Sequence, residues 1–278
     1  MNRMMKAGMV VAFSIVSLVG CQTPTQTQDV KQEKAKEVAL SEQQVMADVW
    51  FQTAGESKAL YYQGYNVGKM KLDEALKKKT QKKPAIVLDL DETVLDNSPY
   101  QAMTVKEGKG YPYKWDDWIQ AAKAEALPGA VPFLQYANEK GVSIYYISNR
   151  KQKNQLEATI KNMKNLGIPQ ADADHVLLQS ENEKGKDERR KKVTAEREIV
   201  LFFGDNLSDF QAFDQKNVKD RNQAVENVRS SFGEKFIVFP NPMYGDWESA
   251  VYQYDSKKSD ADKDKARKDA MRIFEYNK

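Results

Sequence analysis

AIVLDLDETVLDNSPY, which runs from Ala85 to Tyr100, leads an apolar strand directly into a group of acids. The apolar residues fit a strand that is buried on both faces. Asp89 and Asp91 stand two positions apart at its end, so an extended chain directs both side chains to the same side. Two carboxylates held close together repel each other and are costly to remove from water. The stretch therefore predicts either a bound divalent cation or one protonated carboxyl.

Both conditions suit phosphoryl transfer. One aspartate can attack phosphorus, while the other gives a proton to the leaving oxygen. The alternative is that Asp89 and Asp91 only cap a helix and close a loop. The residues at the other strand ends decide between these interpretations.

Four more short apolar runs follow, each of strand length and rich in β-branched or aromatic residues. They are Val142–Ile147, Val176–Leu178, Ile199–Phe203 and Phe236–Phe239. Helical stretches lie between several of them, including Lys151–Leu166, which Gly167 ends. Alternating strands and helices predict an α/β fold with a parallel sheet that is covered on both faces. Ligands of such sheets bind beyond the carboxyl ends of the strands.

Two of these strand ends carry polar groups that suit a phosphate and a metal. Ser148 and Asn149 offer a hydroxyl and an amide as donors for phosphate oxygens. Asp205 could complete an all-oxygen shell for Mg²⁺, which prefers carboxylates, carbonyls and water. Between them, ENEKGKDERRKK offers a lysine that could neutralise the phosphoryl group and the attacking aspartate. This order of groups favours phosphoryl transfer over simple capping.

The ordered set resembles the haloacid dehalogenase (HAD) superfamily. Its parts are Asp89-x-Asp91-x-Thr93, Ser148, a lysine, and Gly204-Asp205 with Asp209. More narrowly, VLDLDETVLDNSPY and VLFFGDNLSDF resemble the two halves of the signature of class C bacterial acid phosphatases, surface lipoproteins of which some act as 5′-nucleotidases. WFQTAGESKALYYQGYN and NPMYGDWE also resemble family segments, so the resemblance covers about residues 40–255. It implies a HAD-like Rossmannoid parallel sheet with a small helical accessory (cap) lobe.

The resemblance also implies a role for each matching position. Asp89 would attack phosphorus, form an aspartyl-phosphate and bind Mg²⁺. Asp91 would act first as the general acid and then as the base, and would contact the metal through its backbone carbonyl. Ser148 would bind phosphate. Asp205 would be the third protein ligand, with Asp209 orienting it or holding a water of the metal.

The lysine of the family pattern lies a few residues ahead of a basic pair. This spacing favours Lys186, with Lys184 as the alternative. The loop is one residue shorter here than in the family pattern, so the alignment leaves both positions open.

Two aromatic segments, YPYKWDDW and NPMYGDWE, are expected at the mouth of the site. An aromatic pair can sandwich a nucleobase or a nicotinamide ring. The ring-stacking residues of the family lie in these segments, which indicates Trp115 and Tyr244. The alternative is that these aromatics only pack in the core or in a lid.

The N-terminus, MNRMMKAGMVVAFSIVSLVGCQ, has the basic start and short apolar run of a secretory signal. The run ends in LVGC, which resembles a lipobox, and the only cysteine, Cys21, would become the lipidated first residue. An ordinary signal peptide is the alternative. We expect a signal peptide over residues 1–20 and a flexible tether over 21–40. Acyl chains such as palmitate would hold the protein on the bacterial surface, at the outer or the cell membrane.

Composition limits the remaining choices. One cysteine and one histidine exclude an internal disulfide framework and a Cys-rich or His-rich metal site. Residues 1–20 carry Arg3 and Lys6 and no acid, so without them the formal net charge of +3 falls to about +1 (3 − 2), and this near-neutral balance argues against binding to a nucleic-acid polymer. Residues 41–278 would form the phosphatase domain, with its core at about 82–255. The helical lobe would combine residues 41–80 and 100–125 with a charged C-terminal helix, whose apolar end, residues 271–274, is expected to dock.

These interpretations together predict a Mg²⁺-dependent acid phosphomonoesterase. Its expected substrates are 5′-nucleotides, including nicotinamide mononucleotide, and other phosphomonoesters. A non-catalytic ligand-binding surface lipoprotein and a phosphotransferase with the same aspartyl-phosphate are the alternatives. The resemblance also suggests a homodimer.

Overall fold

The computed structural model describes residues 39–211, 213 and 216–276. The predicted signal peptide, Cys21 and nearly all of the predicted tether lie outside the described residues. Within the described part of the chain, no helix has both the length and the apolar character needed to cross a membrane.

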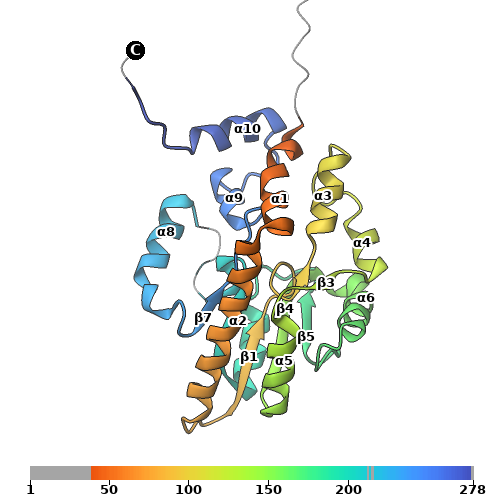
Figure 1. The fold of residues 1–278 in the computed structure, drawn as a ribbon, viewed down its shortest axis with the longest axis vertical. Coiled ribbons are helices and arrows are strands. Elements are labelled where there is room, and N and C mark those ends of the chain that lie inside the picture. The colour runs from red at the N-terminus through yellow and green to blue at the C-terminus, as the bar shows by residue number, and fades with distance from the viewer. Residues whose placement is uncertain (1–38, 212, 214–215, 277–278) are drawn as a thin grey trace, which may run out of the picture. The chain divides into compact units, whose positions relative to one another are not determined.

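A five-stranded parallel sheet forms the centre of the fold, with the strand order β5-β4-β1-β6-β7 (Figure 1). In chain order its strands are β1 (Lys83–Leu88), β4 (Ser143–Lys151), β5 (Val176–Gln179), β6 (Arg197–Gly204) and β7 (Phe236–Val238). Each predicted apolar run overlaps one of these strands, so the predicted α/β fold is confirmed. A separate antiparallel pair joins β2 (Leu95–Asp96) to β3 (Glu125–Ala126).

Helices cover both faces of the sheet. They are α1 (Val45–Thr53), α2 (Gly55–Leu76), α3 (Ser98–Lys106), α4 (Trp115–Ala121), α5 (Ala130–Glu139), α6 (Gln152–Asn165), α7 (Asp187–Glu196), α8 (Val218–Asn227), α9 (Asp246–Val251) and α10 (Asp260–Asp269), with 3₁₀ turns η1 (Leu40–Gln44), η2 (Leu207–Asp209) and η3 (Arg229–Ser231). Successive residues of β1 pack into two different cores, since Ile86 and Leu88 join α2 and α5, whereas Ala85 and Val87 join α7 and α8. Alternate residues of a strand face opposite sides, so β1 is buried on both.

The long helix α2 supports the loop that follows β1. Tyr65 donates a hydrogen bond of 2.7 Å to the carbonyl of Thr93, and Tyr61 donates one to the carbonyl of Glu92. The helix approaches β6 closely at Gly68, where an added Cβ would lie 2.5 Å from the ring of Phe203. Residues of α2, which the sequence analysis assigned to a helical lobe, therefore pack on the sheet and hold the loop.

The C-terminal segment differs from its prediction. The helix α10 ends at Asp269, and the apolar residues beyond it are exposed, Phe274 by 84%. The expectation that this apolar end docks is therefore not met among the described residues of this chain, where the helix ends before Met271. Arg267 holds α10 instead, through the carbonyl of Leu40 at 3.2 Å and the carboxylate of Glu248.

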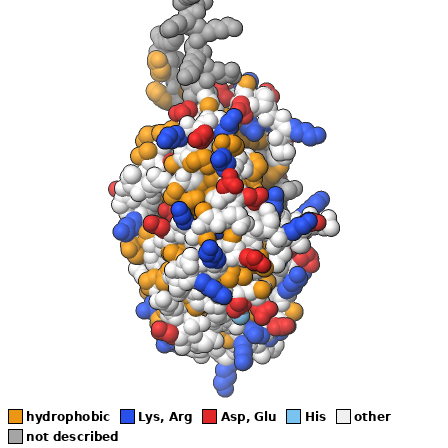
Figure 2. All heavy atoms as spheres, turned by 90° about the vertical axis from the view of Figure 1, so that its right-hand side faces the viewer, with side chains coloured by type: hydrophobic (Ala, Val, Ile, Leu, Met, Phe, Trp, Pro, Cys, Tyr) orange, Lys and Arg blue, Asp and Glu red, His pale blue; other side chains and the backbone are white. Residues whose placement is uncertain are grey.

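The surface mixes both signs of charge. Figure 2 shows basic and acidic side chains interspersed on the face that carries α3, α4 and α6, with hydrophobic side chains gathered mainly in its upper part. A nucleic-acid polymer is bound through a continuous basic patch or stripe. This face offers no such stripe among its visible residues.

Candidate active site

The site is built at the carboxyl end of the central strand. The ladder of β1 and β6 continues to Asp89, whose backbone N–H donates to the carbonyl of Phe203 at 3.0 Å. Beyond Asp89 the chain turns, and the carbonyl of Leu90 accepts hydrogen bonds from Val94 and Leu95. Asp89 is therefore fixed by the sheet, whereas Asp91 lies on the turn.

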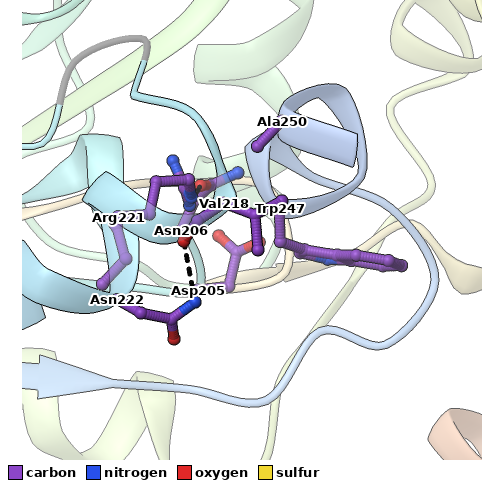
Figure 3. Close-up of a pocket in the computed structure, with 8 residues that line it drawn as sticks. Asp205, Asn206, Val218, Arg221, Asn222, Trp247 and Ala250 are labelled. Atoms are coloured by element: carbon purple, nitrogen blue, oxygen red, sulfur yellow. Dashed lines mark hydrogen bonds between the residues drawn. The ribbon is translucent and has the colours of Figure 1, made fainter. Parts of the chain in front are cut away.

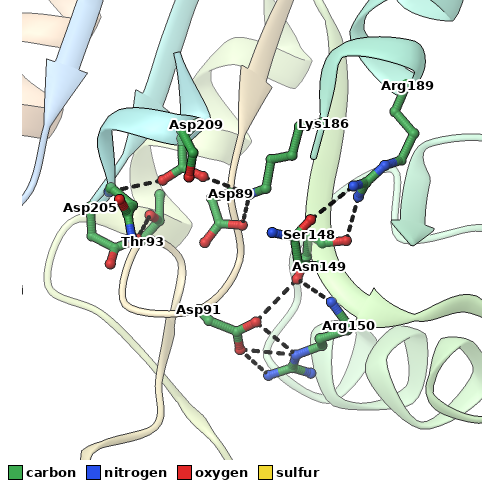
Figure 4. A network of polar contacts seen from close by, with 12 residues as sticks. Asp89, Asp91, Thr93, Ser148, Asn149, Arg150, Lys186, Arg189, Asp205 and Asp209 are labelled. Atoms are coloured by element: carbon green, nitrogen blue, oxygen red, sulfur yellow. Dashed lines mark hydrogen bonds and ion pairs between the residues drawn. The ribbon is translucent and has the colours of Figure 1, made fainter. Parts of the chain in front are cut away.

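The two aspartates bond to different partners. Asp89 pairs with Lys186, whereas Asp91 pairs with Arg150 (Figure 4). The sequence analysis expected both side chains on the same side, an expectation that required an extended chain. The strand ends at Leu88 and the chain bends at Leu90, so this condition is not met, although both side chains line one cleft.

Three carboxylates cluster around one lysine. Asp89, Asp205 and Asp209 each offer an oxygen, and these oxygens lie within 4.8 Å of one another. The ammonium of Lys186, which is only 3% exposed, bonds to Asp209 at 2.7 Å and to Asp89. The cluster thus holds three carboxyl groups but only one ammonium group. Because the cluster is buried, water does little to offset this shortage of positive charge.

The pKa values of the cluster reflect this shortage. Burial raises the pKa of Asp89 from 3.8 to about 7, with Lys186 opposing the rise and Asp209 and Asp91 adding to it. Burial raises the pKa of Asp205 well above its ordinary value, and the charges of Asp209 and Asp89 add to the effect. Burial lowers the pKa of Lys186, but its carboxylate partners raise it to a value above the ordinary one.

These residues fit a divalent metal ion. Clustered carboxylate oxygens are the ligands of a hard cation such as Mg²⁺. Such a cation would supply the positive charge that one lysine cannot. Asp89 and Asp205 were predicted as ligands, and the structure places Asp209 with them. The carboxylate of Asp91 lies with Arg150, and the predicted contact through its backbone carbonyl stays a prediction.

Short turns present the acids after β6. The backbone N–H of Asn206 donates to Asp209 at 2.9 Å, which folds η2 back onto the strand end. The close approach of η2 to the strand end needs a glycine at position 204, because an added Cβ there would lie 2.3 Å from the Cβ of Asp209. Asp205 accepts hydrogen bonds from Asn241 at 2.8 Å and Thr93 at 3.3 Å.

The structure distinguishes the two candidate lysines. Lys186 immediately precedes α7 and reaches into the cluster, whereas Lys184 is exposed. Between them Gly185 adopts φ +64°, which turns the chain into the site.

The predicted phosphate-binding pair lies beside the cluster at the end of β4. Ser148 is fully buried, and its hydroxyl donates to Asp91 at 3.1 Å. Asn149 is exposed, and its side-chain oxygen accepts from Arg189 at 2.9 Å. Arg189 also donates to the carbonyl of Ser148, which fixes the end of the strand.

A cleft of about 1020 Å³ opens over these groups. Both predicted stacking residues, Trp115 and Tyr244, line it together with Asp89, Asp91 and Lys186. The ring of Trp115 lies edge-on to Tyr100, with centroids 4.9 Å apart. The structure therefore brings the predicted aromatics and the acids to one cavity, with half-buried rings at its wall.

A smaller side pocket of about 200 Å³ lies between α8 and α9 (Figure 3). Its lining comprises Asp205, Asn206, Leu207, Val218, Arg221, Asn222, Trp247 and Ala250. Among the described residues that line this pocket, Asp205 is the only acid, and it also lines the large cleft together with Asp89 and Asp209. The other two acids of the cluster therefore face the large cleft.

Sequence reasoning missed three residues of the site. Arg150, Asn97 and Asn241 all bond to its aspartates. Arg150 follows the predicted Ser148-Asn149 pair directly, which is the one signal that could have identified it. The two asparagines stand in quoted segments, but an isolated amide has no distinctive pattern.

Comparisons with known proteins point to one family. The family described as HAD superfamily, subfamily IIIB (acid phosphatase), matches residues 3–247. Two solved structures of the class C acid phosphatase from Bacillus anthracis, one of them with tungstate bound, are each 68% identical to this chain. Each covers 86% of this chain and 100% of its own, with a TM-score of 0.84.

Proposed function

This chain belongs to the acid phosphatases of HAD subfamily IIIB, and from this premise we propose that it is a Mg²⁺-dependent enzyme that works through an aspartyl-phosphate. The predicted family and the predicted phosphomonoesterase class are confirmed. The alternative of a non-catalytic surface protein is thereby set aside. The choice of Mg²⁺, the covalent intermediate and the substrate are the parts that we propose.

One observation carries the proposal: Asp89 lies fixed at the end of the central strand, paired with Lys186 and flanked by further acids. In the first step an oxygen of Asp89 attacks phosphorus, and the bond to the leaving oxygen breaks as Asp91 gives it a proton. Lys186 offsets negative charge on the phosphoryl group. Water then attacks the aspartyl-phosphate, Asp91 takes a proton from that water, and phosphate and free Asp89 result.

A bound Mg²⁺ would lie among Asp89, Asp205 and Asp209 and would neutralise charge on the phosphoryl oxygens. Ser148 would then turn its hydroxyl from Asp91 to the phosphate. The tungstate of the Bacillus anthracis structure supports an oxyanion site in this family.

The lining and the volume of the cleft support the proposal that 5′-nucleotides, including nicotinamide mononucleotide, are the substrates. Trp115 and Tyr244 at its wall offer faces on which a flat ring can stack. The volume of about 1020 Å³ is ample for a mononucleotide.

The test is phosphate release near pH 5 to 6 by the chain without residues 1–21. Nicotinamide mononucleotide, adenosine monophosphate and 4-nitrophenyl phosphate are compared, each with Mg²⁺ and with EDTA. We expect Mg²⁺-dependent release, fastest on a nucleotide, and none from Asp89→Asn. An added alcohol that diverts most phosphate to a new ester would instead support a phosphotransferase. Failure of every substrate with folded, metal-loaded protein would contradict the proposal.

We also propose that Cys21 carries the lipid anchor at the bacterial surface. The lipobox-like LVGC supports this. Mass spectrometry of the N-terminal peptide from protein made in a bacterium with lipoprotein processing would show acyl chains on Cys21. A Cys21→Ser variant that stays in the membrane fraction would contradict it.

A further inference from the structure

Four donor groups surround the carboxylate of Asp91. Arg150 donates to Oδ1 through Nη2 at 2.7 Å and through Nε at 2.9 Å, and Asn97 donates to Oδ1 at 2.8 Å. Ser148 donates to Oδ2 at 3.1 Å, and Nε of Arg150 lies at 3.3 Å from the same oxygen (Figure 4). Oδ1 therefore accepts three short hydrogen bonds, whereas Oδ2 accepts longer ones.

Arg150 is a buried cation that depends on Asp91. Its side chain is 2% exposed, and a guanidinium keeps its charge at any ordinary pH. Within the described residues, Asp91 is the carboxylate that forms an ion pair with it. If Asp91 moved away, a buried charge would be left without its partner, which is strongly unfavourable. Arg150 therefore keeps Asp91 in one place.

Neighbouring groups fix the side chains of Arg150 and Asn97, which both donate to Asp91. Nη1 of Arg150 donates to Thr159 of α6 at 3.0 Å, and the ring of Trp115 lies 5.8 Å from its Cζ. Trp118 donates to Oδ1 of Asn97 at 2.8 Å. An indole N–H can only donate, so the amide nitrogen of Asn97 must face Asp91.

We propose that Arg150 is a positioning residue, which holds Oδ1 of Asp91 so that Oδ2 carries the proton given to the leaving oxygen. The inference rests on the proposed role of Asp91 as the general acid. The three donors on Oδ1 leave no room for a proton there, whereas Oδ2 keeps only the longer contact of 3.3 Å with Nε of Arg150 once Ser148 turns to the phosphate. The proton passes from Oδ2 to the leaving oxygen as its bond to phosphorus breaks. In the second step, Oδ2 takes a proton from the attacking water.

The dependence on the leaving group tests this role. A nucleotide leaves as a basic alkoxide and needs the acid, whereas 4-nitrophenolate leaves readily without it. We compare kcat/KM for the two substrates, because this ratio reports the first, leaving-group step even where the second limits kcat. Arg150→Met should lower kcat/KM by about 100-fold for the nucleotide and by less than about threefold for 4-nitrophenyl phosphate.

Three further single variants and one double variant make the result specific. Arg189→Met removes another buried guanidinium that bonds to β4 but not to Asp91, and it should affect both substrates by the same factor. Arg150→Lys keeps the charge without the planar fork and should show a smaller loss with the same selectivity. It also serves where Arg150→Met does not fold. Asp91→Asn should show the selective loss itself, and adding Arg150→Met to it should cause no further selective loss.

The outcomes separate the claim that Arg150 positions Asp91 from the claim that Asp91 is the general acid. Selective loss in Asp91→Asn, with equal losses for both substrates in Arg150→Met and Arg150→Lys, would overturn the role of Arg150 alone. A raised inhibition constant for inorganic phosphate together with equal losses would show that Arg150 binds the phosphate instead. Absence of selective loss in Asp91→Asn would overturn the proposed function of Asp91.

Discussion

Replacing Lys186 by methionine removes the only base among three acids. Its ammonium lies 2.7 Å from Oδ1 of Asp209 and also bonds to Asp89. The side chains of Lys186, Asp89 and Asp209 are all buried. Methionine matches the length of the chain but supplies no charge. Without a metal ion, the carboxylates of this variant must repel each other or take up protons.

The structure sets the scale of the effect. Two unit charges 2.7 Å apart attract by about 6 kcal/mol at an effective dielectric constant of about 20. The cost of desolvating the ammonium offsets part of this attraction, and removing one partner of a buried pair typically costs about 3–5 kcal/mol. We therefore expect Lys186→Met to lower the free energy of unfolding by about 3–5 kcal/mol without metal. Mg²⁺ should recover part of this loss.

Urea unfolding, followed by tryptophan fluorescence at pH 7.5, measures this difference. Lys184→Met is the matched control, because Lys184 is exposed in the same loop and should change the free energy by less than about 0.5 kcal/mol. Activity of Lys186→Met should fall by about 10²–10³-fold even with saturating Mg²⁺. If metal-free Lys186→Met were as stable as the unaltered protein, the account of the charge balance would be wrong.

Three more predictions follow from the geometry. Trp115→Ala and Tyr244→Ala should each raise KM about tenfold for nucleotides, because ring stacking is worth about 1–3 kcal/mol, and should change KM little for a small aryl phosphate; equal effects would remove the stacking role. Gly204→Ala should lower the melting temperature and the affinity for Mg²⁺, because its Cβ would lie 2.3 Å from the Cβ of Asp209; an unchanged titration calorimetry curve would contradict this. The raised pKa of Asp89, about 7 against an ordinary 3.8, means that the folded metal-free protein holds a proton that the unfolded chain releases. Its stability should therefore fall as the pH rises from about 4 to about 7. Mg²⁺ should thus raise the melting temperature more at pH 7.5 than at pH 5, and equal gains would refute this.

The sequence predicted the sheet and the place of the site well. Each strand is a compact apolar run, and parallel strands end at one edge, so Asp89, Ser148 and Asp205 could be placed together before any coordinates. Lys186 was favoured from its spacing to a basic pair, and the structure brings it to Asp89.

Tertiary contacts account for what could not be predicted. Asp89 and Asp91 both line the cleft, but they bond to different partners because the chain bends at Leu90, a change that no apolar pattern records. The place of Arg150 depends on Asp91 and Thr159, which lie 59 and 9 residues away in the chain. Likewise, the helix of Tyr65 was assigned to the small helical lobe and packs on the sheet, because a sequence pattern does not say which surface an amphipathic helix covers.

The most direct test of the central claim is to trap the phosphorylated enzyme. Protein is mixed with a nucleotide labelled with ³²P at its phosphate, quenched in acid within one turnover and digested. The account predicts labelled protein with Mg²⁺, with the label on the peptide that contains Asp89, and none in Asp89→Asn or with EDTA. Unlabelled protein during rapid turnover, together with an Asp89→Asn variant of normal activity, would contradict it.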